Sequence, residues 1–90
     1  MEFRMLPIGY GHLVSEARLI AIVTPEPAPI KRLVQDARDR HTLVDATAGR
    51  KTKSVLIMDS DHIVLSALPP EALNILRSGS DQGGEEKGDT

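Results

Sequence analysis

The chain has 90 residues, with 11 lysines and arginines, 13 aspartates and glutamates, and no cysteine. This length fits one small domain. The lack of cysteine excludes a disulfide framework, a thiolate zinc site and a cysteine nucleophile. The first residues lack the layout of a signal peptide, and no run approaches the roughly 20 apolar residues that cross a bilayer. The sequence therefore predicts a cytoplasmic protein without a membrane segment.

The net charge of −2 is unevenly distributed along the chain. Residues 79–90 hold four acidic residues and one basic residue, which leaves ten basic and nine acidic residues in 1–78. The tail is rich in glycine and has no large apolar side chain, a composition typical of disorder. We expect a folded domain over 1–78, able to present a basic surface, and a disordered acidic tail over 79–90.

The first quarter of the chain predicts two strands. Residues 3–8 and 18–24 are apolar and in part β-branched, a pattern typical of strands. Between them, Gly9 and Gly11 flank Tyr10, which predicts a tight connection.

A helix is expected to begin near Pro29, a favourable first-turn residue, and to end near Arg40 or His41. Its apolar residues recur at helical spacing and form one stripe: Ile30, Leu33, Val34 and Ala37. The other faces carry lysine and arginine, with Asp36 and Asp39 among them. This mixture favours a solvent-exposed surface crossed by salt bridges between neighbouring turns.

The second half predicts three strands, at 42–46, 54–58 and 63–67, and a short helix at 70–77. The polar segment 59–62 predicts a hairpin turn. The resulting order is β-β-α-β-β-β-α. We expect an α+β fold, a small and mostly antiparallel sheet with one central helix and a short C-terminal helix.

Four of the strands show little polar alternation, which indicates a sheet that is covered on both faces. Two short helices are not expected to cover both faces. The missing cover predicts a second copy of the chain, and closure of the sheet within one subunit is the alternative.

The strongest candidate site is a basic loop. Arg50, Lys51 and Lys53 follow Gly49 and precede an apolar strand. Neighbouring cations on a loop can neutralise adjacent phosphates, the contact that dominates non-specific DNA affinity. A loop whose charges only keep it solvated is the alternative, and the residues alone leave it open. Arg18 is a further candidate, because a charge that starts a buried strand should face solvent or a ligand.

Other chemistries have weaker support. Asp59, Asp61 and His62 could hold a divalent cation, but such residues are also common in hairpin turns. No nucleophile, base and oxyanion donors converge. Only Phe3 and Tyr10 are aromatic, which argues against a single-strand binder that stacks bases. We expect no catalytic residue, no metal, no cofactor and no small-molecule substrate.

Three long segments, at 8–14, 22–40 and 43–67, closely resemble the extracellular matrix regulatory protein RemA family of bacteria. They contain IGYGHLV, IVTPEPAPIKRLVQDARDR and LVDATAGRKTKSVLIMDSDHIVLSA. The resemblance covers residues 3 to about 76. It implies a DNA-binding transcriptional regulator, associated with activation of biofilm-matrix genes. It also implies a ring-like homo-oligomer of several subunits, around which DNA is bound or wrapped.

The resemblance further implies that arginines matching Arg18, Arg50 and position 51 contact DNA. Lysine stands at 51 where the family commonly has arginine. A phosphate contact survives that change, whereas a bidentate base contact does not. We therefore expect Arg18, Arg50, Lys51 and Lys53 to bind double-stranded DNA, in a protein associated with the nucleoid.

Two alternatives remain. One is a non-catalytic structural or protein-interaction module that assembles with itself. The other is a metal-dependent enzyme centred on the 59–62 turn, which we rank last.

Overall fold

The computed structural model describes residues 4–78; the expected acidic tail, 79–90, lies outside them. The elements in chain order are the strands β1 (Met5–Gly9) and β2 (His12–Ser15), the short 3-10 helix η1 (Glu16–Arg18), the strand β3 (Leu19–Val23), the helix α1 (Ala28–Asp39), the strands β4 (Leu43–Asp45), β5 (Ser54–Met58) and β6 (Ile63–Ser66), and the helix α2 (Pro70–Ser78).

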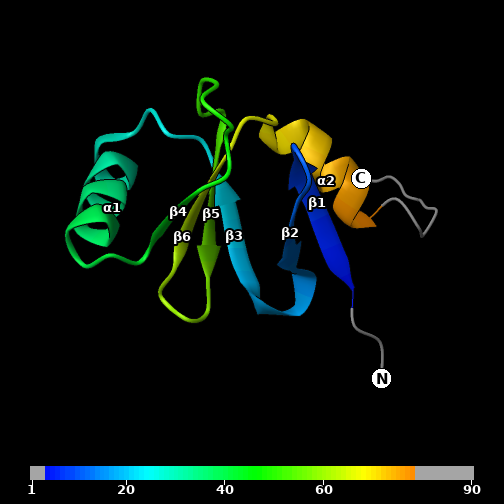
Figure 1. Ribbon diagram of the computed structural model, residues 1–90, viewed down its shortest axis with the longest axis horizontal. Helices are drawn as coiled ribbons and strands as arrows, with labels where there is room; N and C mark the ends of the chain where they lie inside the picture. The colour runs from blue at the N-terminus through cyan, green and yellow to red at the C-terminus, as the bar shows by residue number, and fades with distance from the viewer. Residues whose placement is uncertain (1–3, 79–90) are drawn as a thin grey trace.

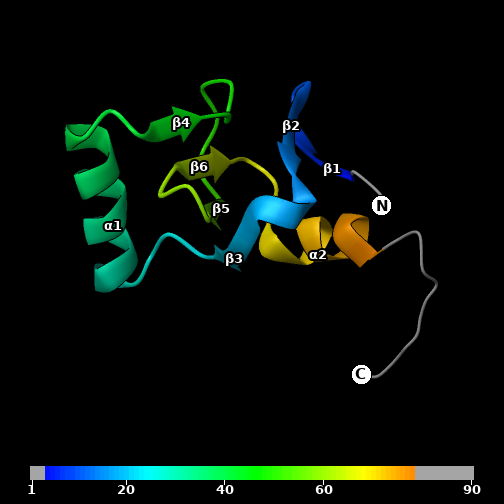
Figure 2. The same ribbon diagram turned by 90° about the horizontal axis from the view of Figure 1, so that it is seen from below.

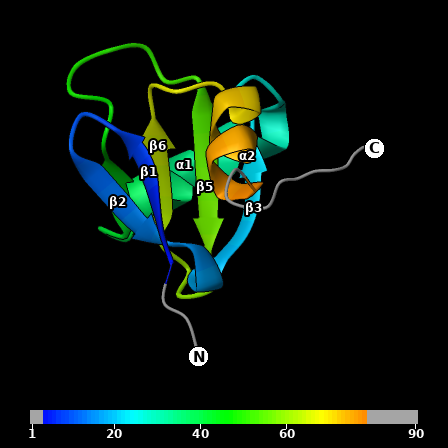
Figure 3. The same ribbon diagram turned by 90° about the vertical axis from the view of Figure 1, so that its right-hand side faces the viewer.

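The described part of the chain forms three layers. A four-stranded sheet in the order β3-β5-β6-β4 is the middle layer. The helix α1 covers one face of this sheet, and the β1–β2 hairpin and α2 lie over the other (Figures 1 and 2). The hairpin and α2 lie beside each other in front of the sheet (Figure 3). All pairings are antiparallel except that of β4 with β6.

The face under α1 is built from the apolar stripe of the helix. Ala37 is buried, and Ile30 and Val34 pack with it against buried residues of β5 and β6. Leu33, at the border of the stripe, remains 40% exposed. Burial of this stripe, rather than helix propensity alone, holds the helix on the sheet.

The opposite face has the larger apolar cluster. Leu6 and Ile8 of β1, Leu56 of β5 and Leu73 of α2 are fully buried in it. These four side chains come from three elements, so their packing fixes the hairpin and α2 on the sheet.

Two buried hydroxyl groups connect the same layers. The Ser66 Oγ donates to the carbonyl of Ile8 at 2.8 Å and accepts from the Leu68 N–H at 3.1 Å. The Ser54 Oγ donates to the carbonyl of Leu68 at 2.6 Å. Each serine thereby gives a backbone carbonyl a hydrogen-bond partner.

The α+β class and the order of the seven expected elements are confirmed. The structure adds one strand, β2, which the sequence did not predict. It pairs antiparallel with β1 across a two-residue turn, and β1 begins and ends later than the expected strand at 3–8.

The expectation that both sheet faces are covered is also confirmed. The prediction of a second copy assumed that only the two helices of the chain could cover the sheet, and this assumption was wrong. The β1–β2 hairpin of the same chain supplies the cover that two helices could not. Sheet burial therefore gives no reason for oligomerisation, and the ring remains a prediction. No helix among residues 4–78 is long and apolar enough to cross a membrane.

Candidate nucleic-acid interface

The basic loop, residues 46–53, connects β4 to β5 and turns sharply at its tip. The Arg50 N–H donates to the Thr47 carbonyl at 3.0 Å, and the two residues between them have positive φ, 54° for Ala48 and 79° for Gly49. Two successive left-handed residues define a type I′ turn. Glycine adopts this conformation at little cost, whereas alanine pays roughly 1–2 kcal/mol. The turn therefore reverses the chain at the tip of the loop and places Arg50 directly after the reversal.

Both ends of the basic loop are fixed to β6. The Ala46 N–H donates to the Leu65 carbonyl, and the Lys53 N–H to the Ser66 carbonyl, each at 2.9 Å. Ala46 is buried, whereas Arg50, Lys51 and Lys53 are exposed. The loop therefore carries its cations on an anchored segment, not on a loosely attached one.

A side-chain turn reinforces the first of these ends. One carboxylate oxygen of Asp45, Oδ1, accepts hydrogen bonds from the Thr47 hydroxyl at 2.6 Å and from the Thr47 N–H at 3.0 Å. These two bonds lower the pKa of Asp45, with a smaller contribution from the positive charge of Arg38. Asp45 is thus a structural anion at the base of the loop.

The three predicted cations of the loop have no carboxylate close by. Among residues 4–78, no Asp or Glu oxygen lies within 4.0 Å of the side-chain nitrogens of Arg50, Lys51 or Lys53. Their charge is therefore available to a phosphate without first breaking an ion pair.

Arg50 has a different partner, an aromatic ring at the tip of the β1–β2 hairpin. Its guanidinium carbon lies 5.1 Å from the centre of the Tyr10 ring, a cation–π contact. Tyr10 and Gly11, with φ of 55° and 82°, form the two-residue turn between β1 and β2. The contact joins the hairpin to the basic loop and limits the orientations of Arg50.

Sequence reasoning missed the role of Tyr10. The available signal was its place between two glycines, because an aromatic side chain on a glycine-rich turn has little core to enter. In the structure it is 50% exposed.

Replacing Tyr10 by alanine is expected to weaken DNA binding about two- to fivefold, because an exposed cation–π contact is worth roughly 0.5–1 kcal/mol. Fluorescence anisotropy with a labelled duplex measures this. Tyr10→Phe retains the ring and should bind within about twofold of the wild type. Equal losses in both variants would show that the hydroxyl, not the ring over Arg50, matters.

Arg18 lies away from the basic loop. It ends η1, where its carbonyl accepts from the Asp59 N–H at 2.8 Å and its guanidinium lies 3.5 Å from the Asp59 carboxylate. The side chains are 67% and 46% exposed, so the ion pair contributes little to stability. Arg18 and the basic loop lie beyond opposite ends of β5, a separation of at least about 13 Å at the strand's rise per residue. Figure 1 shows this arrangement, with η1 in blue at the bottom and the loop in green at the top.

The 59–62 segment forms the expected hairpin turn between β5 and β6. The Met58 N–H donates to the His62 carbonyl at 3.1 Å, and Asp61 has a φ of 68°. The Ser60 hydroxyl lies 2.9 Å from the His62 Nδ1, while the Asp59 carboxylate faces Arg18. These contacts engage the side chains of Asp59, Ser60 and His62 in the turn or next to it.

Comparison with known proteins supplies the family. The profile of the RemA-like family, described as extracellular matrix regulatory protein A-like, matches residues 5–75. The chain is 56% identical over 73 residues to extracellular matrix regulatory protein A of Bacillus subtilis, which covers 81% of this chain and 82% of that protein.

Two further relatives agree over more of the chain. A regulatory protein of Clostridium acetobutylicum is 53% identical over 83 residues, or 92% of this chain and 90% of its own length. One of Geobacillus kaustophilus is 54% identical over 86 residues, or 96% and 99%. The chain therefore belongs to the RemA-like family of bacterial regulatory proteins.

Proposed function

We propose that this protein is a DNA-binding transcriptional regulator that acts in the cytoplasm as a ring-like homo-oligomer and contacts duplex DNA through its repeated basic loops. The observation that carries the proposal is the anchored, exposed loop with Arg50, Lys51 and Lys53, whose cations have no carboxylate nearby within residues 4–78. The regulatory names of the relatives support the regulatory part. Regulation of biofilm-matrix genes is the corresponding role that we propose.

The mechanism is multivalent electrostatic binding. One loop with three cations binds weakly, but a ring repeats it around its circumference, and linked sites gain through effective concentration. Bending of the duplex around the ring costs free energy that the added phosphate contacts offset. Lys51 acts as a point charge on phosphate, without the bidentate base contact of an arginine.

Arg18 gives each subunit a second, separate contact in this mechanism. Because it lies beyond the opposite end of β5 from the basic loop, the two sites of one subunit are expected to meet different phosphates. Its bond to Asp59 is weak enough to exchange for a phosphate oxygen.

Exposed apolar side chains supply a surface for subunit contacts. Large apolar residues that are at least half exposed occur on β1, β2, β3 and α2: Met5, Leu13, Ile20 and Ile75. We propose that they take part in contacts between subunits, because covering apolar surface favours association. The same observation favours the alternative function, a structural or protein-interaction module that assembles without binding DNA.

A salt titration of the wild-type protein on a labelled duplex distinguishes the two functions. The proposal predicts that the logarithm of the association constant falls linearly with the logarithm of salt concentration, by about 0.9 for each phosphate neutralised. Six or more contacts would lower affinity about a thousandfold between roughly 50 and 200 mM salt. An intact oligomer that does not bind DNA at low salt would favour the assembly module.

A further inference from the structure

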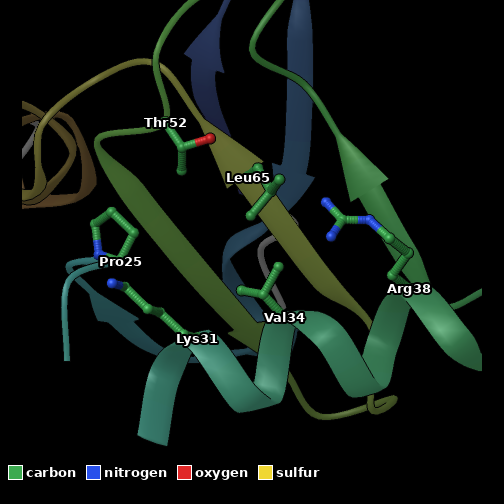
Figure 4. A pocket seen from close by; sticks show the side chains of 6 residues that line it. All are labelled: Pro25, Lys31, Val34, Arg38, Thr52 and Leu65. Atoms are coloured by element: carbon green, nitrogen blue, oxygen red, sulfur yellow. The ribbon is translucent and has the colours of Figure 1, made fainter. Parts of the chain in front are cut away.

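A shallow groove runs between α1 and the sheet on the side of the basic loop (Figure 4). Its volume is about 290 Å³, and it is lined by Pro25, Lys31, Val34, Arg38, Thr52 and Leu65. Pockets that enclose whole small ligands usually measure roughly 300–1,000 Å³. The small volume and open shape of the groove therefore fit part of a nucleic-acid phosphate backbone better than a small molecule that the protein encloses.

The ionisable residues that line this groove are both cations. Lys31 and Arg38 are seven residues apart on α1, which places them on the same flank two turns apart, about 10 Å along the helix axis. Both are exposed. That distance corresponds to the axial rise of about three nucleotides along one DNA strand.

The opposite flank of α1 has a different character. The groove there is lined by Asp36 of the helix, by Arg40 directly after the helix and by Asp61 of the β5–β6 turn, so both signs of charge are present. The helix therefore separates its charges, with cations alone in the groove next to the basic loop. Sequence reasoning did not show this, because Asp36 and Asp39 lie between the basic residues in the chain.

The cations of α1 are also not held in salt bridges with their helix neighbours. Across the described residues, no carboxylate lies within 4.0 Å of the Lys31 or Arg38 nitrogens, and the expected pairs between Asp36 and neighbouring arginines do not form. Arg38 donates a long hydrogen bond, 3.5 Å, to the side-chain oxygen Oε1 of Gln35. The positive charge of Arg38 contributes to the lowered pKa of Asp45, whose Oδ1 is already occupied by Thr47.

The groove is continuous with the basic loop. Thr52 lines it and lies in the chain between Lys51 and Lys53. Figure 4 shows Thr52 across the groove from α1, with Lys31 and Arg38 extending from the helix toward the sheet. A threonine hydroxyl is a common donor to phosphate oxygens.

We infer that this α1 groove is a second phosphate-binding surface for the same duplex, in which Lys31 and Arg38 bind backbone phosphates next to those bound by the basic loop. The inference rests on the proposed function and extends its contact surface onto α1. Charge complementarity identifies the occupant, because a strand of phosphates matches a groove whose charged lining is entirely cationic. The contacts are to the backbone, so they add affinity and not sequence preference.

The test replaces both cations by glutamine, which removes the charge and keeps the first part of each aliphatic stem. Lys31→Gln with Arg38→Gln is compared with Arg32→Gln with Arg40→Gln, which removes two charges from α1 and its C-terminal cap outside the groove. The full-length proteins are titrated with a labelled duplex of mixed sequence at several salt concentrations. The groove variant is expected to bind about ten- to thirtyfold more weakly, with a salt slope lower by about 0.9 for each lost contact. The matched control should remain within about twofold of the wild type.

A charge-preserving variant tests whether the positive charge, rather than the identity of the two side chains, is required, and a thermal melt of each variant at equal protein concentration checks that it is folded. Lys31→Arg with Arg38→Lys retains both cations and should bind within about twofold of the wild type. The inference is overturned if the groove variant binds like its matched control while Arg50 and Lys51 prove essential. It is also overturned if the charge-preserving variant binds as weakly as the groove variant. If the wild type binds no DNA, the proposed function fails and the inference fails with it. If the wild type binds DNA but the groove variant binds like its control, the inference alone fails.

Discussion

Replacing Arg50 and Lys51 together by alanine is expected to abolish detectable binding to duplex DNA in a gel-shift assay. Both side chains lie on the exposed part of an anchored loop. Within residues 4–78, no carboxylate forms an ion pair with either of them. Each lost phosphate contact also removes the entropy gain of a released counterion. The loop is repeated in every subunit of the proposed oligomer. The loss of binding free energy is therefore multiplied by the number of loops that contact the same duplex.

The fold and the assembly should be unaffected by this double substitution. The anchors of the loop are backbone bonds and the Asp45–Thr47 contacts, none of which uses the two substituted side chains. Sedimentation of the variant should therefore match that of the wild type. Lys51→Arg should bind at least as well as the wild type. Retained DNA binding by the double alanine variant would refute the site assignment.

Truncation of Leu56 to alanine is expected to have the largest effect on stability. Leu56 is fully buried on the central strand β5, where it lies opposite Ile22 on one side and Val64 on the other. Removing a buried leucine side chain usually lowers the free energy of unfolding by about 2–5 kcal/mol. For a domain of this size, each kilocalorie corresponds to roughly 4–8 °C in melting temperature, so a fall of at least about 8 °C is expected.

The comparison needs fixed protein concentration, because association contributes to apparent stability in an oligomer. Arg32→Ala, an exposed substitution on α1, should change the free energy of unfolding by no more than about 0.5 kcal/mol. Leu56→Met keeps nearly the same volume and should cost less than about 1.5 kcal/mol. A Leu56→Ala variant as stable as Arg32→Ala would contradict the packing of β5 between the two clusters.

The sequence predicted the elements whose periodicity is strong. The stripe from Ile30 to Ala37 identified α1, and β5 and β6 were recognisable because nearly every residue in them is apolar. The strand β2 was missed because it has four residues, two of them polar, and no core pattern. The two glycines around Tyr10 predicted the tight connection itself, but not that the four residues after it pair back with β1.

The spatial relation of the candidate contacts could not be predicted from the chain. Arg50, Lys51 and Lys53 are neighbours in sequence and remain together in the structure. Arg18 is separated from them because β3 and β5 are antiparallel, which puts the start of β3 beside the end of β5. The cationic flank of α1 could be recognised only from the structure, because it depends on which side of the helix faces the groove next to the basic loop.

The basis for expecting an oligomer also changed. Apolar strands first suggested that a partner must cover the sheet, and the hairpin now explains that burial. What remains is the exposed apolar surface of the hairpin, β3 and α2, with Ile20 at 62% and Ile75 at 67% exposure. The subunit contacts of the proposed ring therefore use exposed apolar side chains, and the faces of the four-stranded sheet stay covered by the subunit itself.

Sedimentation velocity of the full-length protein, alone and mixed with a labelled duplex, is the most direct test of multivalent DNA binding by an oligomer. At about 50 mM salt, where phosphate contacts are strong, the account predicts a protein species several times heavier than one subunit. It also predicts that this species shifts the DNA boundary to faster sedimentation and that added salt reverses the shift. A protein that sediments as a monomer, or a DNA boundary that the protein does not move, would contradict it.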